Sequence, residues 1–417
     1  MSETIPLLAL GVMFVVATLL PINIGILAFV AAFLVGTASL GLTEEEILAG
    51  FPTSLFITIA GVTYLFAVAQ RNGTVDLLVR GGVQLVRGKL ALIPWVLFAV
   101  CGMLSALGTF PTAAIALLAP AGLKLAQRHG MSQLLIGAVL VAGAHAGSFS
   151  PIAVSGALVL GMIEQTPLHI APHVLFLASF AFNLLIAAVS FFVLRGHRRA
   201  GSSHSDQTRE VDRAETAAKV DWRQALTLTL LVLLVVGALV LQLEIGFLAL
   251  GAGALLALVD VHRQSKAVEG ISWSTIMLIG GMITYVEILE KAGTIDAISR
   301  GAAQLGSPLL VALVLCVVVA VVSAFASSTA LLTAIIPIAV PVLLFSDLSA
   351  PGLIAALAVS ATIVDTSPFS SNGALVLSNT NDADKTTMYR QLLGYTAVIA
   401  AFGPVFAWGL LVLPGSS

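Results

Sequence analysis

Apolar residues come in runs of about 18–22 along the whole chain, and each run is long enough to cross the ~30 Å hydrocarbon layer of a membrane. The pattern predicts an all-α polytopic membrane protein in contact with lipid. Composition agrees, because 59% of the 417 residues are hydrophobic and 10% are charged, whereas a soluble domain carries about a quarter charged residues. No feature of the composition indicates a nucleic-acid partner. Hydropathy gives ten full spans, at residues 5–20, 22–41, 53–70, 133–163, 171–195, 222–242, 245–261, 272–289, 352–379 and 391–413.

Two further apolar segments, at about 90–127 and 308–345, are too long for one helix each. Both are interrupted by small polar residues, which read SALGTFPT at 105–112 and SAFASST at 323–329. Such interruptions at membrane depth favour a turn that is surrounded by protein. We therefore expect each segment to form a re-entrant hairpin that enters and leaves the membrane on one side.

The distribution of Lys and Arg then sets the orientation. If both segments are hairpins, 17 of the 19 Lys and Arg residues fall on one side of the membrane, and only Lys291 and Arg300 fall on the other. The positive-inside rule makes the richer face cytoplasmic. It predicts an inner (plasma) membrane protein with both termini outside and the 196–221 loop in the cytoplasm. If either hairpin were instead a pair of full crossings, every other loop would stay on the same side of the membrane. The charge distribution alone therefore does not prove that the two segments are re-entrant hairpins.

Many residues recur at a spacing of 217 positions, and the segment 72–85 resembles 292–305 at a spacing of 220. The chain is predicted to hold two copies of one unit, residues 1–195 and 222–417, joined by a polar linker at 196–221. Each copy has five crossings, an odd number, so the copies must be inverted in the membrane. Inverted repeats are typical of secondary transporters. The pairs include Thr112 and Thr329, Pro120 and Pro337, Ser150 and Ser367, Pro151 and Pro368, and Gly156 and Gly373.

Spans 133–163 and 352–379 contain the related motifs SPIAVSGALVL (150–160) and SPFSSNGALVL (367–377). Proline removes a backbone donor and disrupts the preceding helical turn. We expect each span to break into two half-helices, whose free N–H groups attract an anion and whose free carbonyls suit a cation. The alternative is that these residues are only kinks or close-packing points.

No Lys or Arg falls within a predicted span core, so an anionic substrate must be held by helix termini, hydroxyls and co-bound cations. No cofactor is expected other than a coupling ion, Na⁺ or H⁺. The candidate substrate-binding residues are Ser105, Thr109, Thr112, His145, Ser150, Ser155, Ser327, Ser328, Thr329, Ser370, Ser371 and Asn372. The candidate Na⁺ ligands are Thr112, Gly147, Ser148, Thr329, Asp365 and Ser367.

Two ionisable residues near the breaks have alternative interpretations. Asp365 either ligates Na⁺ or carries a proton, as intramembrane acids often do, or it is a solvated helix end. His145 either donates a hydrogen bond to a substrate carboxylate or makes a structural hydrogen bond.

A hairpin followed by a broken helix, present twice and inverted, resembles the ion transporter superfamily, which includes the divalent anion/sodium symporters. Within it, FPTSLFITIAGVTYLFAVAQRNGTVDLLV (51–79) and GAHAGSFSPIAVSG (143–156) resemble the MatC-type malonate and dicarboxylate carriers. The N-terminal half carries most of this likeness. The resemblance implies an elevator-type homodimer, in which spans 1–3 and 6–8 form a scaffold while the hairpins and spans 4, 5, 9 and 10 form a moving transport domain.

The hairpin tips of this chain differ from each other. In the sodium symporters a Ser-Asn-Thr triplet at each tip touches substrate carboxylates and Na⁺. The matching positions here are Phe110-Pro111-Thr112 and Ser327-Ser328-Thr329. The first tip therefore departs from the symporter pattern.

We expect a secondary active transporter that imports a small dicarboxylate, such as malonate or a similar C3/C4 acid, with Na⁺ or H⁺ by an elevator mechanism. An Na⁺/H⁺ antiporter or a carrier of another small anion is the alternative within the superfamily, although an antiporter would need several buried acids. A hydrolase built on Ser148 or Ser150, His145 and Asp365 is disfavoured, because the repeat does not copy His145. A passive channel is disfavoured because tips that meet from opposite sides suit an occluded site.

Overall fold

The computed structural model of this chain is all-helical over the part it describes, and no strand occurs there. The described residues are 4–20, 22–84, 90–164, 166–194, 221–241, 243–264, 266–294, 307–325, 327–344, 346–381 and 383–415. The predicted linker, apart from Asp221, and the copied segment at 295–305 lie outside them.

Each predicted span and hairpin of the first half corresponds to one helix or to two consecutive helices. In chain order these are α1 (Thr4–Leu19), α2 (Ile24–Leu40), α3 (Glu44–Leu48), α4 (Thr53–Arg71), α5 (Thr74–Gln84), α6 (Ile93–Ala106), α7 (Pro111–Arg128), α8 (Gln133–Ser148), α9 (Val154–Glu164) and α10 (Pro172–Leu194).

The second half repeats this order. Its helices are α11 (Trp222–Leu239), α12 (Ile245–Val259), α13 (Val261–Gln264), α14 (Trp273–Lys291), α16 (Pro308–Ser323), α17 (Ser328–Leu344), α18 (Ala350–Thr362), α19 (Ser371–Ser378) and α20 (Lys385–Ala407). Helices α7, α8 and α9 begin 217 residues before α17, α18 and α19, and α6 ends 217 residues before α16. The helix bounds thus follow the repeat in the sequence, while the inverted orientation of the two copies stays a prediction.

Within the described residues, three helices are by length and composition able to cross a membrane: α4, α10 and α20 with its extension to Val412. Many of the remaining apolar helices and helical segments have only 10–17 residues. Short helices fit the predicted broken spans, in which two pieces together make one crossing, and the predicted hairpins, whose arms do not cross.

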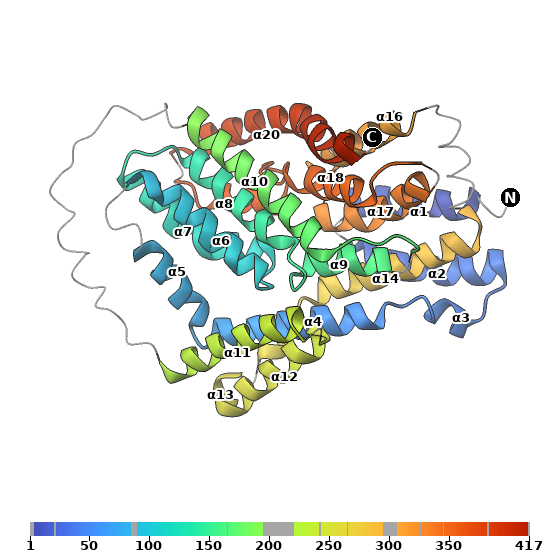
Figure 1. Cartoon of the computed structure of the whole chain (residues 1–417), viewed down its shortest axis with the longest axis horizontal. Helices are drawn as coiled ribbons and strands as arrows, with labels where there is room; N and C mark the ends of the chain where they lie inside the picture. The colour runs from blue at the N-terminus through green and yellow to red at the C-terminus, as the bar shows by residue number, and fades with distance from the viewer. Residues whose placement is uncertain are drawn as a thin grey trace.

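The helices pack as two groups. In Figure 1, α4, α11 and α12 of the first group lie below α6, α8 and α10 of the second. In the first group α2 packs against α14 and α4 against α12, and α1 and α11 lie on these pairs. In the second group α6, α7 and α10 surround α8, while α16, α17 and α20 surround α18. The groups meet where α9 contacts α4 and where α17 contacts α14.

Glycines allow two helix pairs of the first group, α2 with α14 and α4 with α12, to cross at close distance. A Cβ atom at Gly281 of α14 would overlap the carbonyl oxygen of Gly25 on α2. A Cβ atom at Gly61 of α4 would overlap the carbonyl oxygen of Gly246 on α12. Small residues let membrane helices approach until their backbones touch, so both crossings depend on glycine.

Candidate functional site

Both predicted helix breaks are present. Helix α8 ends at Ser148 and α9 begins at Val154, whereas α18 ends at Thr362 and α19 begins at Ser371. Pro151 and Pro368 lie in the connections between the half-helices.

The repeated Ser and Gly of the two motifs shape these connections in the same way. The hydroxyl of Ser150 accepts from the N–H of Ile152 at 3.4 Å, and the hydroxyl of Ser367 accepts from the N–H of Phe369 at 3.2 Å. A Cβ atom at Gly156 or Gly373 would overlap the carbonyl oxygen of Ser150 or Ser367, respectively. The motif is therefore a turn so tight that only glycine fits beside it.

A cavity lies where the two breaks meet the tips of the two helical hairpins. The space open to the centres of water molecules is about 50 Å³. Its wall comes from both halves of the chain: Phe110, Pro111, Thr112, His145 and Ser155 from the first, and Ser327, Ser328, Thr329, Leu332, Thr362, Asp365, Ser370, Ser371 and Asn372 from the second.

The wall follows the 217-residue repeat. Both members of five related pairs line the cavity: Phe110 and Ser327, Pro111 and Ser328, Thr112 and Thr329, His145 and Thr362, and Ser155 and Asn372. Equivalent positions of the two copies thus face one space, which is the arrangement expected of a site at a repeat interface.

Four helices begin at this cavity. The first two residues of α7, α17 and α19 line it, as does Ser155, the second residue of α9. The first N–H groups of a helix have no partner within the helix, and the helix dipole adds partial positive charge there. The cavity is therefore favourable for an anion although no Lys or Arg lines it.

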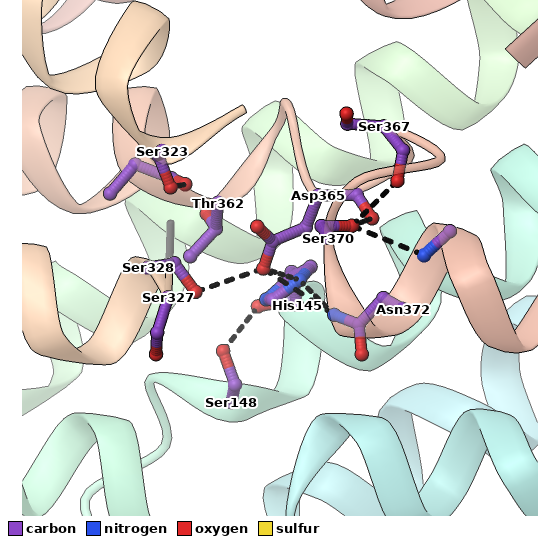
Figure 2. Close-up of polar contacts among 12 residues, drawn as sticks. His145, Ser148, Ser323, Ser327, Ser328, Thr362, Asp365, Ser367, Ser370 and Asn372 are labelled. Atoms are coloured by element: carbon purple, nitrogen blue, oxygen red, sulfur yellow. Dashed lines mark hydrogen bonds and ion pairs between the residues drawn. The ribbon is translucent and has the colours of Figure 1, made fainter. Parts of the chain in front are cut away.

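Asp365 is the centre of the polar contacts in the wall (Figure 2). Its Oδ2 atom lies 3.0 Å from Nε2 of His145 and accepts from the Ser328 hydroxyl at 2.9 Å and from the Asn372 amide at 3.4 Å. These three partners come from α8, α17 and α19. The side chain therefore joins both halves and the second hairpin tip.

Asn372 and Ser370 complete this network. The Asn372 amide nitrogen lies 3.0 Å from His145 Nε2. The Ser370 hydroxyl donates to the carbonyl oxygens of Asp365 and Ser367 and accepts from the N–H of Gly373, which caps α19. Nδ1 of His145 and Oδ1 of Asn372 are buried and have no hydrogen-bond partner within the described residues. A buried polar atom without a partner is costly, so a bound ligand or water would stabilise this wall.

Asp365 is only 5% exposed and His145 only 3%. The burial of Asp365 excludes the interpretation as a solvated helix end. It is the only acid among the described residues that line the cavity, whereas an Na⁺/H⁺ antiporter is expected to need several.

Ten of the residues singled out in the sequence line the cavity, namely Thr112, His145, Ser155, Ser327, Ser328, Thr329, Asp365, Ser370, Ser371 and Asn372. Ser105, Thr109, Gly147, Ser148, Ser150 and Ser367 do not.

The candidate residues outside the cavity wall either form hydrogen bonds with nearby backbone groups or have no hydrogen-bond partner among the described residues. The Ser148 hydroxyl donates to the carbonyl of His145 at 3.0 Å, and the Gly147 carbonyl accepts from the N–H of Ser150. The hydroxyls of Ser105 and Thr109 are buried near the first tip without a hydrogen bond to any described residue. The assignment of individual residues to substrate or Na⁺ stays a prediction.

Four wall residues were not among the candidates: Phe110, Pro111, Leu332 and Thr362. The repeat contained a signal for three of them, because Thr362 is the counterpart of His145 and the other two are the counterparts of Ser327 and Ser328. Leu332 follows Thr329 by three positions on α17 and so lies on the same face of the helix.

These features define a membrane-embedded helical transporter, with half-helices from two copies that converge on one polar cavity. Two solved structures share the fold. The Alcanivorax borkumensis YdaH transporter is 16% identical, with a TM-score of 0.63, over 90% of this chain and 88% of its own. Neisseria gonorrhoeae MtrF, described as illuminating a class of antimetabolite efflux pumps, is 14% identical, with a TM-score of 0.51, over 92% of this chain and 87% of its own.

The N-terminal part of the chain also resembles a known family. Residues 1–148 match the family model described as the N-terminus of the dicarboxylate carrier protein MatC. The predicted resemblance to MatC carriers is therefore confirmed for the part that contains most of the matching motifs. No curated protein matches. The matched family is one of carriers and both solved structures are of transporters, so the comparisons agree with the expectation that the chain is not an enzyme.

Proposed function

We propose that this protein is a secondary active transporter that imports a small dicarboxylate, such as malonate or another C3/C4 acid, together with Na⁺ or H⁺. One observation carries the proposal: four helix N-termini from both halves of the chain converge on a single cavity that no Lys or Arg lines. Such a site binds an anion through backbone N–H groups and hydroxyls and can be approached from either copy of the repeat.

The size of the cavity supports a small substrate. One water needs about 10–15 Å³ when volume is measured by the space open to its centre. The 50 Å³ found here therefore hold about three to five waters, so the cavity excludes large substrates and must widen to admit the seven heavy atoms of malonate. Ligand sites for drug-sized molecules are much larger.

The charge of the site supports coupling to a cation. Two like unit charges 4 Å apart repel each other by about 4 kcal/mol near a protein surface. Asp365 lies in the wall of the cavity, so its carboxylate, when ionised, offsets the attraction of the helix N-termini for a dicarboxylate unless a positive charge accompanies the substrate. Na⁺ or a proton can supply that charge, and binding both together is the basis of symport.

The two packing groups support an elevator mechanism. The group around α2, α4, α12 and α14 would be the scaffold, and the group around α8 and α18 would be the transport domain that carries the cavity. Homodimerisation through the scaffold comes from the family resemblance. The inner membrane location, the external termini and the cytoplasmic 196–221 loop come from the distribution of Lys and Arg.

The test is uptake of labelled malonate by proteoliposomes that contain the purified protein, with an inward Na⁺ gradient and an inward proton gradient imposed separately. We expect one of the two gradients to drive accumulation and unlabelled C3 or C4 dicarboxylates to compete. Asn372→Ala, in the cavity wall, should abolish most uptake. Asn379→Ala is the matched control, because Asn379 bonds the backbone at the end of α19 outside the cavity.

The controls separate the remaining alternatives. Competition by other small anions but not by dicarboxylates would identify a different substrate class. Accumulation only with an outward gradient would identify an exporter, which is the direction that the MtrF description gives for that protein. No transport of any small anion in either direction would contradict the proposal.

A further inference from the structure

The two hairpin tips differ in their surroundings although their sequences are related by the repeat. Gly108 in the first tip is buried against α4, where an added Cβ would overlap Val62 and lie 3.3 Å from the ring of Phe66. Ile152, in the adjacent break, is 6% exposed and belongs to the same apolar cluster as Val62 and Phe66. The first tip is thus docked on the first packing group.

The counterparts in the second half are exposed aromatic rings. Phe325 occupies the position equivalent to Gly108, and Phe369 the position equivalent to Ile152, each 217 residues later. Their exposed fractions are 62% and 52%. The rings stack on each other with centroids 5.4 Å apart, and Phe369 also meets Tyr389 edge to face at 6.2 Å. The second tip therefore presents an apolar surface that no other part of the described chain covers.

The reverse asymmetry occurs one to two turns farther along the hairpin arms. On α17, Ala330, Thr333 and Pro337 are buried, and Ala334 and Pro337 line a small apolar space together with Met282 and Val286 of α14. Their counterparts on α7 are Ala113, Ala116 and Pro120, all of which are exposed. Positions 113, 116 and 120 lie on one face of a helix. Helix α7 therefore presents an uncovered stripe where α17 is docked.

The scaffold surfaces that hold these segments are themselves related. Val62 and Phe66 of α4 correspond to Met282 and Val286 of α14 at the 220-residue spacing. One copy of this surface holds a hairpin tip, while the other holds a hairpin arm. Exchanging the roles of the two copies gives a second arrangement in which equivalent positions meet. Because a Cβ at Gly108 would already overlap Val62, the Phe325 ring must dock farther from α14 than Gly108 lies from α4.

We propose that the Phe325–Phe369 surface docks on Met282 and Val286 of α14 in a second end state of the transporter, while the Ala113–Pro120 stripe of α7 docks on Val62 and Phe66 of α4. The inference rests on the proposed alternating-access function and deepens it, because it names the contacts that are exchanged. The aromatic stack moves with the cavity, and α4 and α14 stay in place. The two sets of contacts exclude each other.

The experiment is intramolecular cross-linking of the full-length protein in proteoliposomes, in a background where the buried Cys101 and Cys316 are replaced by Ser. Ile152→Cys with Phe66→Cys reports the docking seen here. Phe325→Cys with Val286→Cys reports the second end state. A short thiol cross-linker is applied, and mass spectrometry identifies the joined peptides. We expect both pairs to cross-link, each in its own protein.

Mutual exclusion is the decisive measurement. In a protein that carries both pairs, joining residues 152 and 66 first should abolish the link between 325 and 286. Leu117→Cys with Phe66→Cys is a second reporter of the same end state, because Leu117 is the counterpart of Ala334. If malonate is transported but neither second-state pair cross-links, or if such a pair forms while 152 and 66 are joined, the inference is wrong.

The outcome is independent of the substrate. Both cross-links can form and exclude each other in a protein that carries no malonate, which would overturn the proposed substrate and leave the exchanged surfaces standing. Robust malonate uptake without the second-state cross-link would support the proposed substrate and overturn the exchange of docking surfaces.

Discussion

The imidazole Nε2 of His145 lies 3.0 Å from Oδ2 of Asp365, and these two residues come from opposite halves of the chain. Both are almost completely buried. Their contact ties the end of α8 to the break between α18 and α19, so it fixes the two sides of the cavity relative to each other. At this distance the nitrogen and the carboxylate oxygen are in direct polar contact, which couples the two residues to each other.

This coupling is measurable as a double-mutant cycle. Breaking a buried pair by removing one partner costs about 3–5 kcal/mol, because the other partner is left uncompensated. We expect His145→Gln and Asp365→Asn each to lower the free energy of unfolding of the purified protein in detergent. The double variant should lose clearly less than the sum, with an interaction energy of about 1–3 kcal/mol. Additive losses would show that the two side chains act separately.

Thr329 tests whether the wall hydroxyls bind the substrate. A hydrogen bond to a charged group contributes about 1.5–3 kcal/mol, and 1.4 kcal/mol corresponds to a factor of ten in affinity. Thr329→Val, in the cavity wall, should therefore raise the half-saturation concentration for uptake about tenfold or more. Thr284→Val is the matched control, since that hydroxyl donates to the Gly280 carbonyl inside α14. Equal effects of both changes would argue against a binding role.

The breaks and the helix bounds around the cavity could be predicted from sequence because their causes are local. Proline at 151 and 368 removes a backbone donor, and the following Ser and Gly suit a tight turn. The repeat then places each feature twice. Ten of the wall residues were accessible to this reasoning because small polar residues inside an apolar segment need a reason to be there.

The pairing of His145 with Asp365 could not be predicted in this way. The repeat relates His145 to Thr362 and Asp365 to Ser148, so no symmetry operation turns one member of the pair into the other. Their meeting depends on how the second break packs across α8, which is a matter of tertiary structure. The roles of Ser150 and Ser367 could not be predicted either, because the sequence does not distinguish a serine whose hydroxyl shapes a turn from one whose hydroxyl binds a ligand.

Gly156 and Gly373 test the geometry of the breaks. A Cβ at either position would overlap a backbone carbonyl that cannot move without opening the turn, and overpacking of this kind costs about 1–3 kcal/mol. We expect Gly156→Ala and Gly373→Ala each to lower the melting temperature in detergent and to reduce uptake. Gly251→Ala on α12, where nothing lies within 4 Å of the added Cβ, should leave both unchanged. If all three variants behave like the parent, the close approach is absent in the folded protein.

A cross-link between the two packing groups tests the elevator mechanism directly. A Cβ at Gly161 of α9 would lie 2.6 Å from the Leu55 side chain of α4, and this contact joins the proposed transport domain to the scaffold. In the background without native cysteines, a disulfide between Leu55→Cys and Gly161→Cys should stop uptake, and a reducing agent should restore it. The matched control is a disulfide between Trp95→Cys of α6 and Phe191→Cys of α10, whose rings pack within the proposed transport domain with centroids 5.4 Å apart. Because that pair moves as one body, its oxidation should leave most uptake intact. Arrest by the control pair together with free transport by the Leu55–Gly161 pair would mean that α6 moves against α10 and that the two groups do not slide.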